Sequence, residues 1–241
     1  MKHIGIVGGL SPESTIEYYK LICEEYNKQI GGWNFPQITI RSLNLQEIAD
    51  LFMADRWDEM ADVIISAISD LQRAGADFTA IATNTPHNAY EKIREESPLE
   101  VLSIMDATAQ EIQKDGIEKV GLLGTKQTME YGFFQKTFAD YGIKAITPDE
   151  KDRESVNNVI WNELVHGKIT DKARERYKGV IDRLVQRGAE GVILGCTEIP
   201  LLIKPSDSPI KTYDTTTIHA RAILDYAMKE SPAPSRKQDL F

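Results

Sequence analysis

One stretch of this chain occurs twice, and the repeat restricts the fold more than any other feature of the sequence. Residues 71–85 align with residues 184–198 at a constant offset of 113 positions. Both copies run from the end of a helical segment through a glycine turn into a short apolar segment typical of a buried strand. The chain is therefore expected to contain two units of one design. The aligned pairs include Leu71/Leu184, Gly75/Gly188, Ala76/Ala189, Asp77/Glu190, Ile81/Leu194 and Thr83/Cys196.

Short apolar segments alternate with amphipathic helical segments along the chain. Apolar runs that are closed by glycine are typical of strands buried in a parallel sheet. The alternation predicts an α/β fold in which helices cover both faces of each parallel sheet. Strands are expected at residues 4–8, 37–43, 78–82, 101–104, 118–124, 143–146 and 191–194, and helices at 12–26, 57–73, 155–165, 173–186 and 218–227.

The repeat divides the predicted fold into two lobes. Residues 1–112 together with 212–241 are expected to form the first lobe, and residues 113–211 the second. No linker rich in glycine or proline separates the halves, so we expect a tight interface between them. The polar tail from Ser231 is expected to be frayed. On the first helix, the residues expected to be buried are Ile16, Tyr19, Ile22, Cys23 and Tyr26.

The composition argues against several classes of binding partner. The net charge of −9 leaves no basic surface for a nucleic acid. No apolar run reaches the roughly 20 residues of a membrane span, and no signal segment opens the chain. Cys23 and Cys196 are too few for a disulfide framework. These features predict a cytoplasmic protein that binds neither nucleic acid nor membrane.

Four loops follow predicted strands, at the edge where parallel α/β sheets bind ligands. They carry small hydroxyls, amides and backbone N–H groups and nearly lack charge, so a small carboxylate is the expected ligand. The segment Gly5-x-x-Gly8-Gly9 lacks the spacing of a nucleotide-binding fingerprint and predicts a tight turn. The four histidines show no metal-ligand spacing, so no metal is expected. The loops are residues 8–14, 83–87, 124–128 and 195–200.

Cys196 is the strongest catalytic candidate in these loops. It follows a predicted strand, where a helix dipole can lower the pKa of a thiol. Cys23 lies among apolar neighbours within a helix and is interpreted as core packing. Thr83 occupies the position of Cys196 in the first copy of the repeat, so both residues are expected in one active site. His87 could act as a general base or as a hydrogen-bonding residue at a helix end, and the second interpretation is favoured.

The motifs in these loops resemble those of the aspartate/glutamate racemase family, over residues 1–228. The chain is most similar to the L-aspartate/glutamate-specific racemases of that family, some of which also carry threonine at the first catalytic position. The matching motifs are Gly8-Gly9-Leu10-Ser11-Pro12-Glu13-Ser14-Thr15, Asn84-Thr85-Pro86-His87, Leu123-Gly124-Thr125 and Gly195-Cys196-Thr197-Glu198-Ile199-Pro200.

The resemblance implies two flavodoxin-like lobes related by a pseudo-twofold axis, a homodimer, and an enzyme without a cofactor that racemises aspartate or glutamate. One residue removes the Cα proton, and an opposed residue protonates the other face. By this resemblance Cys196, as a thiolate, takes the proton from the L-amino acid, and Thr83 stands in place of a first catalytic cysteine. The residues implied to bind or line the substrate are Leu10, Ser11, Asn84, Thr85, Thr125 and Thr197.

Thr83 alters the expected kinetics. A hydroxyl is a weaker acid than a thiol, so Thr83 is expected to relay a proton through water, helped by His87. Because the two enantiomers have equal free energy, kcat/KM must match in both directions. We therefore expect slow racemisation with unequal kcat values for the L and D enantiomers.

The side-chain carboxylate of an acidic substrate requires a cation. Lys168 is the first candidate, followed by Arg41 and Arg56. Phe52, if it lies near the mouth of the pocket, would instead favour a less polar substrate.

Two other functions fit a pocket with a single cysteine. One is decarboxylation or isomerisation, as in arylmalonate decarboxylase and maleate isomerase, which share the implied fold. The other is amino-acid binding without catalysis, which would produce no deuterium exchange at Cα.

Overall fold

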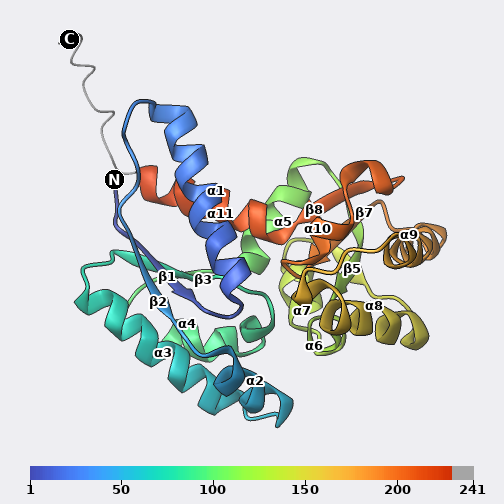
Figure 1. Ribbon diagram of the computed structural model, residues 1–241, viewed down its shortest axis with the longest axis horizontal. Coiled ribbons are helices and arrows are strands. Elements are labelled where there is room, and N and C mark those ends of the chain that lie inside the picture. Colours follow the sequence, from blue (N-terminus) through green and yellow to red (C-terminus); the bar gives the residue numbers. More distant parts are fainter. Residues whose placement is uncertain (230–241) are drawn as a thin grey trace.

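Two parallel β-sheets form the centres of two lobes (Figure 1). The computed structural model describes residues 1–229, and within them each sheet has four strands. The strand orders are β2-β1-β3-β4 and β6-β5-β7-β8, so the second sheet repeats the order of the first. The predicted α/β fold with two parallel-sheet lobes is thereby confirmed. The expected frayed tail from Ser231 lies outside the described residues.

The elements alternate largely as the sequence predicts. The strands are β1 (Ile4–Gly8), β2 (Ile38–Ser42), β3 (Phe78–Ile81), β4 (Val101–Leu102), β5 (Lys119–Gly124), β6 (Lys144–Ile146), β7 (Gly191–Gly195) and β8 (Lys211–Asp214). The α-helices are α1 (Pro12–Ile30), α2 (Leu45–Met53), α3 (Trp57–Arg73), α4 (Tyr90–Glu96), α5 (Ile104–Lys114), α6 (Lys126–Glu130), α7 (Phe133–Asp140), α8 (Glu150–Asn162), α9 (Asp171–Gln186), α10 (Ile199–Leu202) and α11 (Thr215–Met228). Short 3-10 turns are η1 (Thr85–Ala89), η2 (Leu164–His166) and η3 (Pro205–Asp207). Within residues 1–229, no helix combines the length and the apolar character needed to cross a membrane.

Glycine makes the same turn in both copies of the repeat. Gly75 after α3 and Gly188 after α9 have φ values of +89° and +87°. Glycine adopts this left-handed region at little cost, and in both copies the chain then enters a buried strand. Gly9 (φ +79°) makes the turn after β1, where a Cβ atom would clash with the backbone oxygen of Leu43. The Gly8-Gly9 segment is a tight turn, as predicted.

Helix α1 begins as the sequence predicts, and Ile22 and Cys23 are buried as predicted, but Ile16 and Tyr19 are not. The side chain of Ser11 caps it by accepting a hydrogen bond from a backbone N–H in the first turn. Tyr18 and Ile22 are fully buried and pack with α11, whereas Ile16 and Tyr19 are 65% and 49% exposed. The predicted burial of Ile16 and Tyr19 is wrong because α11, which comes from the far end of the chain, determines which face is covered.

A continuous apolar core connects the two lobes. It contains Val7 and Ile81 of the first sheet together with Val120 and Ile193 of the second. Helix α5 joins the lobes, and α11 returns from the second sheet to pack on α1 and α5 (Figure 1). The expected tight interface is therefore present.

The C-terminal segment is shared between the two lobes, whereas the prediction assigned residues 212–241 to the first lobe. Thr212–Asp214 pair with β7 as part of β8, so they belong to the second sheet rather than to the first lobe. Helix α11 then packs on α1, as expected of a segment that returns to the first lobe. The segment 211–214 holds one aromatic residue among three polar ones, and this pattern did not signal a strand. Residues 230–241, which the prediction also assigned to the first lobe, lie outside the described part of the chain.

Candidate active site

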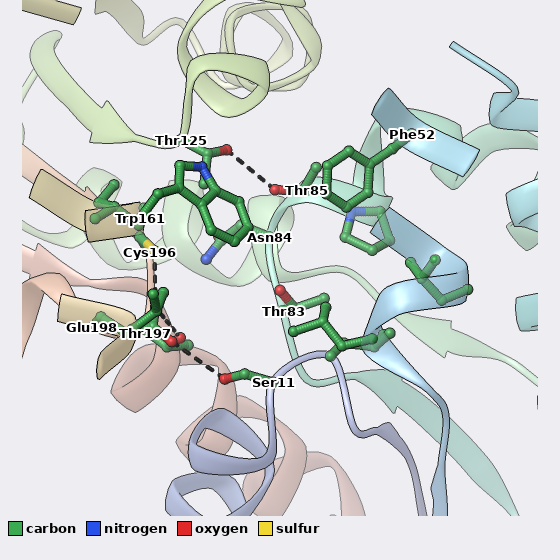
Figure 2. Close-up of a pocket in the computed structure, with 17 residues that line it drawn as sticks. Ser11, Phe52, Thr83, Asn84, Thr85, Thr125, Trp161, Cys196, Thr197 and Glu198 are labelled. Atoms are coloured by element: carbon green, nitrogen blue, oxygen red, sulfur yellow. Dashed lines mark hydrogen bonds between the residues drawn. The ribbon is translucent and has the colours of Figure 1, made fainter. Parts of the chain in front are cut away.

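A pocket lies between the lobes at the carboxyl ends of strands from both sheets (Figure 2). Its lining includes Leu10 after β1, Thr83 after β3, Thr125 after β5 and Cys196 after β7. The two sheets therefore contribute equivalent strand ends to one cavity, which is the arrangement that the repeat predicted. Eight of the predicted site residues line it: Leu10, Ser11, Thr83, Asn84, Thr85, Thr125, Cys196 and Thr197.

Cys196 is a buried thiol at the tip of β7. Its Sγ donates a hydrogen bond to Oε2 of Glu198 over 2.9 Å. Burial raises the pKa of this thiol well above its usual range, the negative charge of Glu198 raises it further, and nearby backbone N–H groups lower it less. The predicted lowering of this pKa is wrong, because burial and the Glu198 charge outweigh the backbone N–H groups that lower it. The hydrogen bond from Sγ to Glu198 is that of a protonated thiol.

Glu198 is a site residue that the sequence analysis placed in a motif but did not select. It is 7% exposed, and its carboxylate accepts hydrogen bonds from the hydroxyls of Thr197 at 2.8 Å and Ser11 at 3.2 Å. Ser11 belongs to the first lobe, so this contact links the lobes beside the thiol (Figure 2). A carboxylate held against a thiol can accept the thiol proton. Because glutamate in a loop is usually solvated, neither the residue type nor the position of Glu198 indicated a site residue.

The side-chain carbonyl oxygen of Asn84 is buried, and no group among residues 1–229 donates a hydrogen bond to it. Its Nδ2 donates to the hydroxyl of Thr215 at 3.2 Å, and that hydroxyl donates to the backbone oxygen of Leu194 at 3.1 Å. Because the hydroxyl has one proton, it must accept from the amide, and this requirement fixes the amide orientation. Asn84 Oδ1 is left without a partner, and since Asn84 lines the pocket, this oxygen can accept a hydrogen bond from an ammonium group.

Thr83 and Cys196 enter the pocket from different lobes (Figure 2). Beside Thr83, the hydroxyls of Thr85 and Thr125 are 3.2 Å apart and form a second hydrogen bond between the lobes. Thr125 also lies 3.0 Å from the hydroxyl of Thr128 at the start of α6. Apart from Glu198, the polar groups of the pocket are thus neutral donors and acceptors from both halves.

The three predicted cations do not line the pocket. Lys168 is exposed on the surface after η2, and Val165 is the residue of this segment that reaches the lining. Arg41 and Arg56 are exposed and form ion pairs with acidic neighbours. Among the described residues, the one charged side chain in the lining is that of Glu198. In residues 1–229, no group of three or more His, Cys, Asp or Glu side chains could hold a metal ion.

His87 supports the structure outside the pocket. It is 1% exposed, and its Nε2 accepts a hydrogen bond from the backbone N–H of Ile104, the first residue of α5, at 3.4 Å. Burial lowers the pKa of His87 to about 4, so the ring is neutral near pH 7. The hydrogen-bonding interpretation of His87 is confirmed. Its expected help to Thr83 has no support, because His87 is absent from the lining.

Apolar side chains line the pocket on two facing sides. Phe52 lies in the lining, and Figure 2 shows it opposite Trp161, with the Thr85–Thr125 hydrogen bond between them. The sequence analysis predicted no helix at α2, so the other contributions of this helix were missed. We call the following six residues the apolar wall: Leu45, Ile48 and Phe52 from α2, and Ile160, Trp161 and Val165 from α8 and η2.

Comparison with known proteins identifies the family. The family model described as Asp/Glu/hydantoin racemase matches residues 7–223. The chain belongs to this family. It is 27% identical over 232 residues to the broad specificity amino-acid racemase RacX of Bacillus subtilis, an alignment that covers 92% of this chain and 96% of that protein.

Solved structures of family members share the two-lobe fold. A provisionally assigned Asp/Glu racemase from Yersinia pestis has a TM-score of 0.90 and 42% identity, over 95% of this chain and 100% of that one. An aspartate racemase homologue from Pyrococcus horikoshii has a TM-score of 0.84 and 37% identity, over the same shares of the two chains. The fold and the racemase family therefore agree with the resemblance drawn from the motifs.

Proposed function

We propose that this protein is an amino-acid racemase that inverts Cα without a cofactor, using Cys196 on one face of the substrate and Thr83 on the other. The observation that carries the proposal is that these two residues, aligned in the repeat, enter one pocket from different lobes. Inversion requires a group on each face of Cα, because one proton leaves and another arrives from the opposite side. The relatives named amino-acid, aspartate and glutamate racemases support this class of reaction.

Cys196 and Glu198 act together on one face. On substrate binding, the Glu198 carboxylate accepts the thiol proton across their 2.9 Å hydrogen bond. The resulting thiolate takes the Cα proton of the L-amino acid, and the electron pair passes into the substrate carboxylate as enolate character. Hydroxyl donors around that carboxylate stabilise the developing charge. Glu198 then releases its proton to solvent, and the next turnover begins from the thiol.

Neutral groups bind the ammonium and the α-carboxylate of the substrate. The unpartnered Oδ1 of Asn84 accepts from the substrate ammonium. The hydroxyls of Thr85 and Thr125 donate to the α-carboxylate, and Thr197, Ser11 and Leu10 complete the lining. The zwitterionic end of an amino acid carries no net charge, so it fits this set without a cation. For the acidic side chain that the resemblance implied, the described lining offers no cation.

Thr83 acts on the opposite face of the substrate Cα through a water molecule. A water molecule hydrogen-bonded to the Thr83 hydroxyl delivers a proton to Cα, and solvent replaces that proton. Because the hydroxyl is a weak acid and His87 does not line the pocket, proton transfer on this face is slow. We propose slow racemisation with unequal kcat values and equal kcat/KM values for the two enantiomers.

Independence from a cofactor, location and assembly are parts of the same proposal. Pyridoxal phosphate requires a lysine for its Schiff base, and none lines the pocket among the described residues. The free cysteines Cys23 and Cys196 support a reducing, cytoplasmic setting. Exposed apolar side chains on and near α1, at Ile16, Tyr19 and Phe35, support a homodimer, which sedimentation analysis tests.

Deuterium exchange tests the proposal. The protein is incubated in D2O with L-alanine, L-methionine, L-aspartate or L-glutamate, and Cα deuteration is followed by NMR together with chiral analysis. We expect deuterium at Cα in both enantiomers of at least one amino acid. Binding without exchange would identify a non-catalytic binder. Turnover of an arylmalonate or of maleate without exchange would identify a decarboxylase or isomerase and overturn the proposal.

Replacing Glu198 by glutamine should lower the pKa of Cys196 and slow the exchange. The Glu198 carboxylate raises the thiol pKa by its charge and hydrogen bond, so a neutral amide shifts the pH dependence of Cys196 alkylation by iodoacetamide to lower pH. Loss of the proton acceptor should slow Cα exchange by about 100-fold. Mass spectrometry resolves alkylation at Cys196 from that at Cys23. Exposed Glu17→Gln is the matched control, and an unchanged alkylation profile in Glu198→Gln would contradict the pairing.

A further inference from the structure

The polar and apolar groups of the pocket come from different structural elements. Its hydroxyls and the Asn84 amide lie at the strand ends, whereas the apolar wall comes from the helices α2 and α8 and the turn η2. Every amino-acid substrate carries an α-ammonium and an α-carboxylate, and these groups match the hydroxyls and the amide at the strand ends. The side chain of the substrate is then directed to the apolar wall.

The charges in the lining disfavour an acidic side chain. Glu198 is the one charged side chain that the described lining contains, and it is negative. A second carboxylate on the substrate would be buried without a cation and would lie in the field of Glu198, and both effects oppose binding. Lys168, Arg41 and Arg56 are exposed outside the lining and do not compensate.

Aromatic contacts hold the apolar wall in place. Phe52 is 5% exposed, and its ring stacks on that of Trp57 with a centroid distance of 6.2 Å and an interplanar angle of 17°. Trp57 in turn meets Tyr131 of the second lobe edge-on at 5.4 Å. The hydroxyl of Tyr131 donates to Asp55 at 3.0 Å, just after α2. This chain of contacts fixes α2 against both lobes, so the α2 part of the wall is a preformed surface.

We propose that the preferred substrate of this enzyme is an amino acid with an uncharged, apolar side chain, such as methionine or leucine, and that aspartate and glutamate are poor substrates. The inference rests on the proposed racemase function and adds the substrate class to it. The apolar wall excludes water from the side chain of the substrate. It provides no group to pair with a charge.

The rates of Cα deuterium exchange with apolar and with acidic amino acids test the proposed substrate class. We expect kcat/KM for Cα exchange to be about 100-fold higher with L-methionine or L-leucine than with L-aspartate or L-glutamate. L-Alanine has too short a side chain to reach the wall and reports racemisation alone. Faster exchange with aspartate or glutamate than with methionine would overturn the inference and leave the racemase function standing. No exchange with any of the five amino acids would overturn the racemase function itself.

Variants of Trp161 test the role of the wall. Trp161 is partly exposed near the end of α8, so Trp161→Arg brings a cation to the wall at a position that tolerates a longer polar side chain. The ratio of kcat/KM for glutamate to that for methionine should rise about tenfold or more. Trp161→Ala should slow methionine exchange more than alanine exchange. Trp33→Arg, at a residue 97% exposed outside the pocket, is the control. An unchanged substrate ratio in both Trp161 variants would show that the wall does not select the side chain.

Discussion

Replacing Cys196 by alanine is expected to slow Cα deuterium exchange by about a thousandfold. Cys196 is the one thiol in the described lining, and its sulfur receives the Cα proton in the proposed mechanism. Glu198 remains in the variant, but its oxygens are held by the hydroxyls of Thr197 and Ser11 and are not placed to replace the sulfur atom. The measurement is the initial rate of Cα deuteration by NMR in D2O, with L-methionine and L-alanine as substrates.

The second cysteine supplies the matched control. Cys23 is buried on α1 and does not line the pocket, so Cys23→Ala should leave the exchange rate close to that of the wild type. Thermal unfolding of both variants separates loss of chemistry from loss of fold. A folded Cys196→Ala protein that keeps the wild-type exchange rate would remove the thiol from the mechanism.

The parts of the site that could be predicted have local causes. Gly75 and Gly188 make the same left-handed turn into a buried strand, and this turn is visible in the sequence. The positions of Thr83 and Cys196 follow from strand ends, because the carboxyl ends of parallel strands meet at one edge of a sheet. The repeat then places the two residues in one pocket.

The parts that could not be predicted depend on contacts between distant segments. Helix α11 decides which face of α1 is buried, and so it decides the exposure of Ile16 and Tyr19. Burial and the Glu198 carboxylate together decide the direction of the Cys196 pKa. The exposure of Lys168 depends on how the loop after η2 lies against the lobe, and residue type alone does not encode it.

The two copies of the repeat differ at a second position that bears on catalysis. Glu198 aligns with Thr85 at the same offset that aligns Cys196 with Thr83. The second lobe therefore supplies a thiol with a carboxylate beside it, and the first lobe supplies two hydroxyls, of which Thr85 is bound to Thr125. The Thr83 face lacks both a good acid and an acceptor for its proton. We infer that proton transfer on this face limits racemisation.

Replacing Thr83 by cysteine is therefore expected to raise the racemisation rate, by about 100-fold. A thiol with an ordinary pKa of about 8.5 is a far stronger acid than a hydroxyl, and the neutral Thr85 beside it does not raise that pKa as Glu198 raises the pKa of Cys196. Chiral analysis of initial rates from each enantiomer should show the two kcat values approaching each other, while kcat/KM stays equal in both directions. Thr83→Ser keeps the hydroxyl and should remain slow. A Thr83→Cys enzyme no faster than the wild type would mean that the second face does not limit turnover, and the asymmetry of the repeat would then have no kinetic consequence.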